Sequence, residues 1–223
     1  MYKVSENPFK NRVDGILPFI IVTSIFVTLY LVSNIMAVKV IGIGNLFYFD
    51  AGTVTFPFAY MLGDVLTEIW GYKTTRRVIY ITLICNIIMV ISTQIGVLLP
   101  SPEYLNKSAE AYNTIFNYVP RIVIGSLTGF LFGELSNAWL MEQIKFKTKG
   151  RFLWLRTIGS SIVGYLFDSV LFVVIAFYGT VPNREILLMI LLQYLLKLLI
   201  EVIFGTPMAY AAIRYLKRRL TEI

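Results

Sequence analysis

Long apolar segments constrain the fold of this chain more than any other feature. Six segments of about 20 residues occur, roughly the length a helix needs to cross a hydrocarbon core about 30 Å thick. They cover residues 16–40, 53–70, 78–99, 119–141, 152–178 and 186–215. Hydrophobic residues make up 57% of the 223 residues, well above the share of about 45–50% in soluble domains. We therefore predict an all-α integral membrane protein, a six-transmembrane-helix bundle that forms a single domain over residues 1–223.

The positions of the basic residues predict the orientation of these helices. Lys and Arg gather in the two chain ends and in the two loops that would lie on the same side, around residues 73–77 and 145–151. The positive-inside rule then places both termini in the cytoplasm. The formal net charge of +7 does not indicate nucleic-acid binding, because each basic cluster adjoins an apolar segment. These clusters are better explained as orientation signals and as contacts with membrane lipid.

Two loops and two prolines interrupt the helical pattern. Residues 42–52 contain three glycines around an aromatic run, which favours an extended hairpin or a loop that dips into the membrane. Residues 106–117 are compatible with a short interfacial helix. Pro57 and Pro207 remove backbone donors, so we expect the second and sixth segments to bend or break near them.

Glycines recur every fourth residue in the fourth segment, at Gly125, Gly129 and Gly133. This spacing places three missing side chains on one helix face, where another backbone can approach closely. The partner is either another helix of the same chain or a second protomer, which would make a homodimer.

Ionisable residues inside the apolar segments are the main candidates for a functional site. A charge near the bilayer centre costs on the order of 2.5–3.5 kcal/mol on insertion scales. The six residues of this kind are Asp64, Glu68, Glu134, Asp168, Lys197 and Glu201. Because acids are in excess, we predict a water-filled polar cavity in the membrane.

Structural explanations compete for some of these charges. Lys197 and Glu201 are four residues apart on one helix, so they could simply neutralise each other. Lys39 and Arg156 lie near segment ends, where long side chains often extend to the interface. Asp64 or Glu201 could bind a proton, although the sequence alone indicates no coupling.

Enzyme functions have little support in this sequence. The chain contains no histidine, which excludes histidine-dependent metal sites and hydrolase triads. An intramembrane aspartyl mechanism would need Asp64 and Asp168 to face each other, and nothing else supports it. We predict no catalytic residue, no metal site and no cofactor.

A set of residues at fixed spacing resembles the queuosine precursor transporter family, also grouped as vitamin uptake transporters. It begins with Ser33, Asn34 and Lys39, and its most specific block runs from Phe56-Pro57-Phe58 through Asp64, Glu68 and Gly71 to Arg76-Arg77. Asp168-Ser169, Lys197 and Pro207 continue it. Thr75 departs from the small residue that usually precedes the paired arginines.

The resemblance implies a function and a location. Members of this family are six-helix proteins of the bacterial inner membrane that import 7-deazaguanine precursors of queuosine, such as 7-cyano-7-deazaguanine. The alternative is a substrate-binding membrane subunit that depends on an ABC-type energising partner. The first segment has only Ala37 where such subunits often carry two small residues for docking, which favours independent transport.

A guanine-like edge presents adjacent N–H donors that one carboxylate can accept together. Our hypothesis is that Asp64, Glu68, Glu134 or Asp168 accepts from this edge, while Asn34 adds a polar contact and aromatic rings stack on the base. Arg76 and Arg77 would contact lipid headgroups, or one of them would act as a gate by pairing with Glu142 or another acid at the inner face. The full set of substrate-binding candidates is Asn34, Lys39, Phe56, Tyr60, Asp64, Glu68, Glu134, Asp168, Lys197 and Glu201.

Overall fold

The computed structural model describes residues 10–43, 47–117, 119–179 and 182–221, which form a bundle of helices with one small β-hairpin. The helices are α1 (Lys10–Ala37), α2 (Phe56–Trp70), α3 (Tyr72–Leu98), α4 (Asn106–Asn117), α5 (Val119–Lys147), α6 (Leu153–Phe177), α7 (Asn183–Ile200) and α8 (Thr206–Thr221). Short helical turns η1 (Ala51–Val54), η2 (Glu103–Leu105) and η3 (Glu201–Gly205) join some of them. Strands β1 (Val40–Ile43) and β2 (Phe47–Asp50) form the hairpin.

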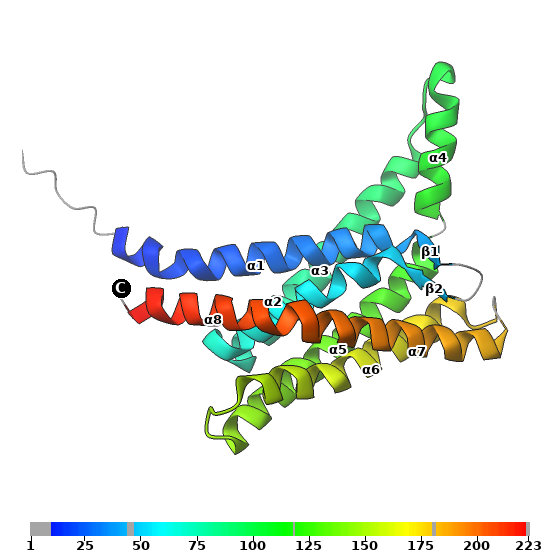
Figure 1. Cartoon of the computed structure of the whole chain (residues 1–223). Helices are drawn as coiled ribbons and strands as arrows, with labels where there is room; N and C mark the ends of the chain where they lie inside the picture. The colour runs from blue at the N-terminus through cyan, green and yellow to red at the C-terminus, as the bar shows by residue number, and fades with distance from the viewer. Residues whose placement is uncertain (1–9, 44–46, 118, 180–181, 222–223) are drawn as a thin grey trace, which may run out of the picture.

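The bundle has two ends that Figure 1 distinguishes. Helix α1 begins and helix α8 ends at the same end, which we call the termini end. The hairpin lies at the opposite end, which we call the hairpin end.

Several helices are long and apolar enough to cross a membrane. In the described part of the chain they are Ile16–Ala37, Tyr72–Leu98, Leu153–Phe177 and Asn183–Arg219. A fifth span results if Glu103–Phe116 and Arg121–Lys147, which meet at a bend of 42°, are counted together. The chain is therefore a multi-pass, predominantly helical membrane protein.

Helix α2 is the short central element of the bundle. Its 15 residues extend only about 22 Å, less than a hydrocarbon core of about 30 Å. Pro57 lies in its first turn, where the missing N–H costs nothing, so the helix begins beside Pro57 and not at residue 53. All its residues from Phe56 to Glu68 except Phe58 are buried, so its polar side chains face protein.

The hairpin follows α1, as the glycine and aromatic pattern predicts. Its strands pair antiparallel from Val40 opposite Asp50 to Ile43 opposite Phe47, and the turn at residues 44–46 lies outside the described residues. β-branched and aromatic side chains favour this extended backbone. Asp50 then caps η1 by accepting from the Thr53 backbone N at 3.0 Å, which connects the hairpin to α2.

Two further local predictions are confirmed. The short helix predicted at residues 106–117 is α4. The sixth segment breaks before Pro207, where the π-helical turn η3 separates α7 from α8. Pro207 disturbs the ordinary i to i−4 pattern, and the Thr206 backbone N–H bonds the Glu201 carbonyl instead. Glu201 and Gly205 of η3 are buried, and η3 packs against α2.

The glycine face of α5 contacts α6 of the same chain. A Cβ on Gly129 would lie 2.8 Å from the Asp168 carbonyl oxygen, and a Cβ on Gly133 would lie 2.8 Å from the Gly164 carbonyl oxygen. The predicted tight contact is thus made within the chain. A second protomer could reach these glycines only by displacing α6.

Candidate functional site

Six of the predicted site residues meet in the middle of the bundle and form what we call the polar centre. They are Tyr60 and Asp64 from α2, Glu134 from α5, Asp168 from α6, Lys197 from α7 and Glu201 from η3. Each is at most 3% exposed. The prediction that these charges gather away from lipid agrees with the structure.

Lys197 pairs with Asp168 and not with Glu201. Its ammonium lies 2.5 Å from the Asp168 carboxylate and 5.1 Å from the centre of the Phe56 ring. The interpretation of Lys197 and Glu201 as a self-neutralising pair is therefore wrong, because the two side chains face different neighbours around the helix. Phe56 borders the polar centre through this contact.

Glu201 and Asp64 each have one neutral hydrogen-bond donor. The Tyr165 hydroxyl donates to Glu201 at 3.1 Å, and the Asn137 amide donates to Asp64 at 2.8 Å. The rings of Tyr60 and Tyr165 lie 4.4 Å apart, so the acids sit beside an aromatic wall.

Several buried polar atoms of the polar centre have no hydrogen-bond partner among the described residues. They are both carboxyl oxygens of Glu134, one oxygen each of Asp64 and Glu201, and the Tyr60 hydroxyl. Buried polar groups are normally satisfied, and leaving one unpaired costs about 1–3 kcal/mol. Unpaired donors and acceptors in one buried place are typical of a site that receives a polar ligand.

Asn34 lies in a second polar group, nearer the hairpin end. It is 3% exposed and accepts a hydrogen bond from the Ser126 hydroxyl, while its amide nitrogen has no partner among the described residues. The Tyr30 hydroxyl donates to the Ser126 carbonyl at 3.2 Å. Tyr30 also packs against Phe56, with ring centroids 5.7 Å apart, so this group adjoins the polar centre.

Lys39 is not part of either group. It is exposed and lines a pocket of about 620 Å³ at the hairpin end, together with Met36, Ala51 and Thr114. The fold separates it from the acids because α1 ends at Ala37, before Lys39.

Glu68 lies at the termini end, where it binds three cations; we call this group the Glu68 cluster. Arg156 contacts both carboxylate oxygens at 3.0 Å, Lys217 lies at 2.8 Å, and Lys145 lies at 3.2 Å. The prediction that Arg156 extends to the interface is wrong, since its side chain is only 3% exposed. Glu68 thereby joins α2 to α5, α6 and α8.

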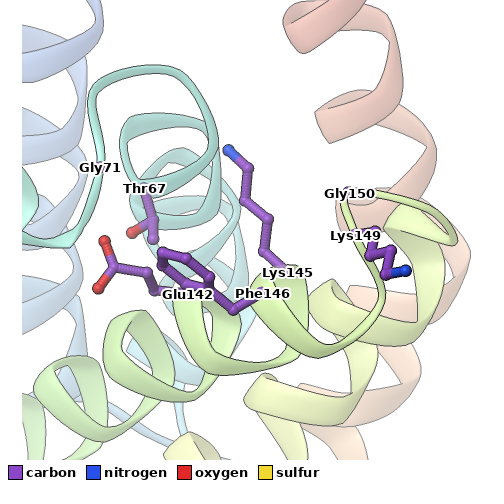
Figure 2. A pocket seen from close by; sticks show the side chains of 7 residues that line it. All are labelled: Thr67, Gly71, Glu142, Lys145, Phe146, Lys149 and Gly150. Atoms are coloured by element: carbon purple, nitrogen blue, oxygen red, sulfur yellow. The ribbon is translucent and has the colours of Figure 1, made fainter.

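A pocket of about 510 Å³ opens beside this cluster at the termini end and is lined by Thr67, Gly71, Glu142, Lys145, Phe146, Lys149 and Gly150 (Figure 2). Lys145 belongs to both the pocket and the Glu68 cluster. Glu142 accepts a hydrogen bond from the Tyr72 backbone N at 3.1 Å.

Arg76 and Arg77 are exposed, and the Arg76 guanidinium lies 5.7 Å from the centre of the Tyr72 ring. Their predicted pairing with Glu142 is absent from the part of the chain that the structure describes.

The polar centre is closed in this structure. Each of its residues is at most 3% exposed, and the three pockets described at the ends of the bundle are lined by other residues. The open, water-filled cavity expected from the sequence is therefore not seen around these residues in the closed state.

Sequence reasoning missed several partners in these groups. Asn137 lies three residues after Glu134, and Tyr165 lies three residues before Asp168. Residues three or four apart share a helix face, so this spacing could have identified them. Lys145 and Lys217 carry no comparable signal, because their contacts with Glu68 join residues far apart in the chain.

Comparison with known proteins shows to which protein family the chain belongs. A model of the family described as "Putative vitamin uptake transporter" matches residues 50–212. The chain belongs to this family. The matched residues include α2 and every residue of the polar centre.

Individual relatives of this chain carry more specific names. The chain is 32% identical to the "Probable queuosine precursor transporter" of Bacillus subtilis (strain 168), over 81% of this chain and 78% of that protein. It is 26% identical to the "Queuosine precursor transporter" of Escherichia coli (strain K12), over 79% of this chain and 78% of that protein. No solved structure matches the chain significantly. Membership in a transporter family agrees with the prediction that the protein is not an enzyme.

Proposed function

We propose that this vitamin uptake transporter imports 7-deazaguanine precursors of queuosine across the bacterial inner membrane, as a secondary transporter. The observation that carries the proposal is the similarity to relatives named queuosine precursor transporters, which extends over about four fifths of the chain. A closed polar centre with unpaired buried groups supports it, because a structural bundle has no need of such groups. Residues 1–223 would act as one transporter domain.

Six membrane passes with both termini in the cytoplasm form part of this proposal. An even number of passes is supported by the position of the start of α1 and the end of α8 at the same end of the bundle (Figure 1). Helix α2, although short, continues through η1 into the hairpin, which extends its reach. The basic residues of the Glu68 cluster lie at the termini end, as the positive-inside rule requires of a cytoplasmic face.

Recognition of the flat base is best supported at Asp64. The Asp64 oxygen that Asn137 does not bind is buried and unpaired, so it can accept from the guanine-like edge of the base. The unpaired Tyr60 hydroxyl is a second contact. The Tyr60 and Tyr165 rings provide an aromatic surface, and Asn34 offers an unpaired amide donor.

The Glu68 cluster is the best-supported gate at the cytoplasmic face. It ties four helices together at the termini end, so release of a substrate on that side requires its ion pairs to separate. A gating role for Arg76 and Arg77 stays a prediction.

Complementation tests the proposal. The chain is expressed in bacteria that can neither make deazaguanines nor import them, a precursor is supplied at low concentration, and queuosine is assayed in tRNA. Restored modification without an added ATPase supports independent import. If the protein reaches the membrane and modification is not restored, the proposal is contradicted, and restoration only with co-expressed ATPase subunits would favour the partner-dependent subunit.

A further inference from the structure

Glu134 has the most unusual environment in the polar centre. Its side chain is 0% exposed, and neither carboxyl oxygen has a hydrogen-bond partner among the described residues. Gly63 of α2 leaves room for it, because a Cβ on Gly63 would collide with one of its carboxyl oxygens. The carboxyl group therefore points into the interface between α5 and α2, directly beside Asp64.

Charge balance shows that the acids of the polar centre cannot all be ionised. The polar centre contains four carboxyl groups and one ammonium, so full ionisation would leave three negative charges without a cation. Asp168 has Lys197 as a charged partner, while Asp64 and Glu201 each accept one hydrogen bond from a neutral donor. Glu134 has neither, and an unpaired buried ion costs several kcal/mol.

The groups that surround Glu134 reinforce this argument. Asp64 and Tyr60 lie on α2, whose Gly63 contacts the Glu134 carboxyl group, while Asp168 and Tyr165 lie on α6 and Glu201 lies on η3. Tyr30 of α1 packs against Phe130, one helical turn before Glu134 on α5. The nearest cation in the polar centre, Lys197, is already held by Asp168. The basic residues of α3, Lys73, Arg76 and Arg77, lie exposed in its first turns at the termini end.

We propose that Glu134 is a proton carrier that couples import of the substrate to inward movement of a proton. The inference rests on the proposed function. In the closed state Glu134 holds the proton as a neutral carboxylic acid. Glu134 takes up this proton from hydronium on the acidic outer side, where a carboxylate oxygen forms the O–H bond before the bundle closes. When the bundle opens toward the cytoplasm and water reaches the side chain, the O–H bond breaks and the proton passes to water, since an ordinary Glu has a pKa of about 4.3.

The full-length protein in sodium-free proteoliposomes provides the test, with radiolabelled 7-cyano-7-deazaguanine as the probe. Net accumulation is measured with the outside more acidic than the inside, and exchange is measured separately with the probe at equal concentration on both sides. For one proton per substrate, accumulation can reach about tenfold for each pH unit of gradient. Glu134→Gln, which mimics the protonated side chain, should lose gradient-driven accumulation, and any exchange that it catalyses should no longer depend on pH.

Matched variants distinguish Glu134 from the other acids. Asp64→Asn and Glu201→Gln are measured alongside, and Glu134→Asp keeps an ionisable group and should keep coupling. The proposal is overturned if Glu134→Gln accumulates the probe as well as the wild type does. It is also overturned if coupling is lost only in Asp64→Asn or only in Glu201→Gln. Because Glu134→Gln could fail to fold, a pH-sensitive dye also records whether protons move inward together with the substrate through the wild type. Transport without proton movement overturns the proposal. Accumulation that appears only when a sodium gradient is added in place of the proton gradient overturns it too. Failure of the proposed function is a different result, since the wild type would then neither exchange nor accumulate the probe.

Discussion

Glu68 illustrates at the residue scale how burial decides the strength of an ion pair. Its partner Arg156 is 3% exposed, whereas its partner Lys217 is 56% exposed. Arg156→Ala should destabilise the protein by about 3–5 kcal/mol, because it leaves a buried carboxylate without its buried cation. Lys217→Ala should cost no more than about 1 kcal/mol, since an exposed pair is largely screened by water. Thermal unfolding in detergent measures both.

The double variant Glu68→Gln with Arg156→Ala provides the control for this prediction. Removal of both charges should recover part of the stability lost in Arg156→Ala, because the unpaired carboxylate is then gone. Equal losses for Arg156→Ala and Lys217→Ala would contradict the assignment of Arg156 as the main partner.

Asp64 allows a second prediction at this scale. Asp64→Asn should weaken binding of 7-cyano-7-deazaguanine about fivefold to a hundredfold, because a buried donor of the base left without its acceptor costs about 1–3 kcal/mol. Equilibrium binding to purified protein measures the effect. Glu110→Gln on α4, an exposed position, should leave the Kd unchanged. An unaltered Kd in Asp64→Asn would rule out Asp64 as the acceptor for the base.

At the scale of elements, the contact between α5 and α6 depends on glycine. Gly129→Ala and Gly133→Ala should each destabilise the protein by about 1–3 kcal/mol, because the new Cβ would press against a backbone carbonyl that cannot move away. Gly125→Ala should cost less, since its nearest backbone oxygen is 3.1 Å away and not 2.8 Å. Fluorescence-detected size exclusion after heating ranks the variants.

Gly159→Ala is the matched control for these variants, because it lies on α6 and its Cβ would meet only the end of the Ile144 side chain at 3.4 Å. It should be neutral or should stabilise by about 0.5–1 kcal/mol, through the higher helix propensity of Ala. Destabilisation of all four variants by the same amount would show that close helix approach is not the cause.

At the scale of the whole molecule, the proposed topology predicts which positions each side of the membrane can reach. In a Cys85→Ser background, Glu103→Cys at the hairpin end should react with a membrane-impermeant thiol reagent in intact cells. Lys147→Cys at the termini end should react only after the membrane is permeabilised. Both native residues are exposed, so access to the reagent depends on the side of the membrane alone. The reverse pattern would contradict cytoplasmic termini.

Much of this architecture could be predicted from the sequence because its causes are local. Apolar length identifies membrane helices, glycine spacing identifies the close face of α5, and Pro207 identifies the break before α8. Asp64, Glu134, Asp168 and Lys197 were candidates because charge inside an apolar segment is costly wherever the segment lies.

Only the tertiary structure decided which charges pair and which remain alone. Lys197 turns to Asp168 on α6 although Glu201 follows it by one helical turn, and Arg156 is buried against Glu68 although it lies near a segment end. Glu134 lies against Gly63 where α2 approaches α5, and its carboxyl oxygens have no hydrogen-bond partner in the part of the chain that the structure describes. Such pairings depend on which helix faces meet across the bundle. The sequence determines which residues lie on each helix face. The packing of the whole chain determines which residues each helix face contacts.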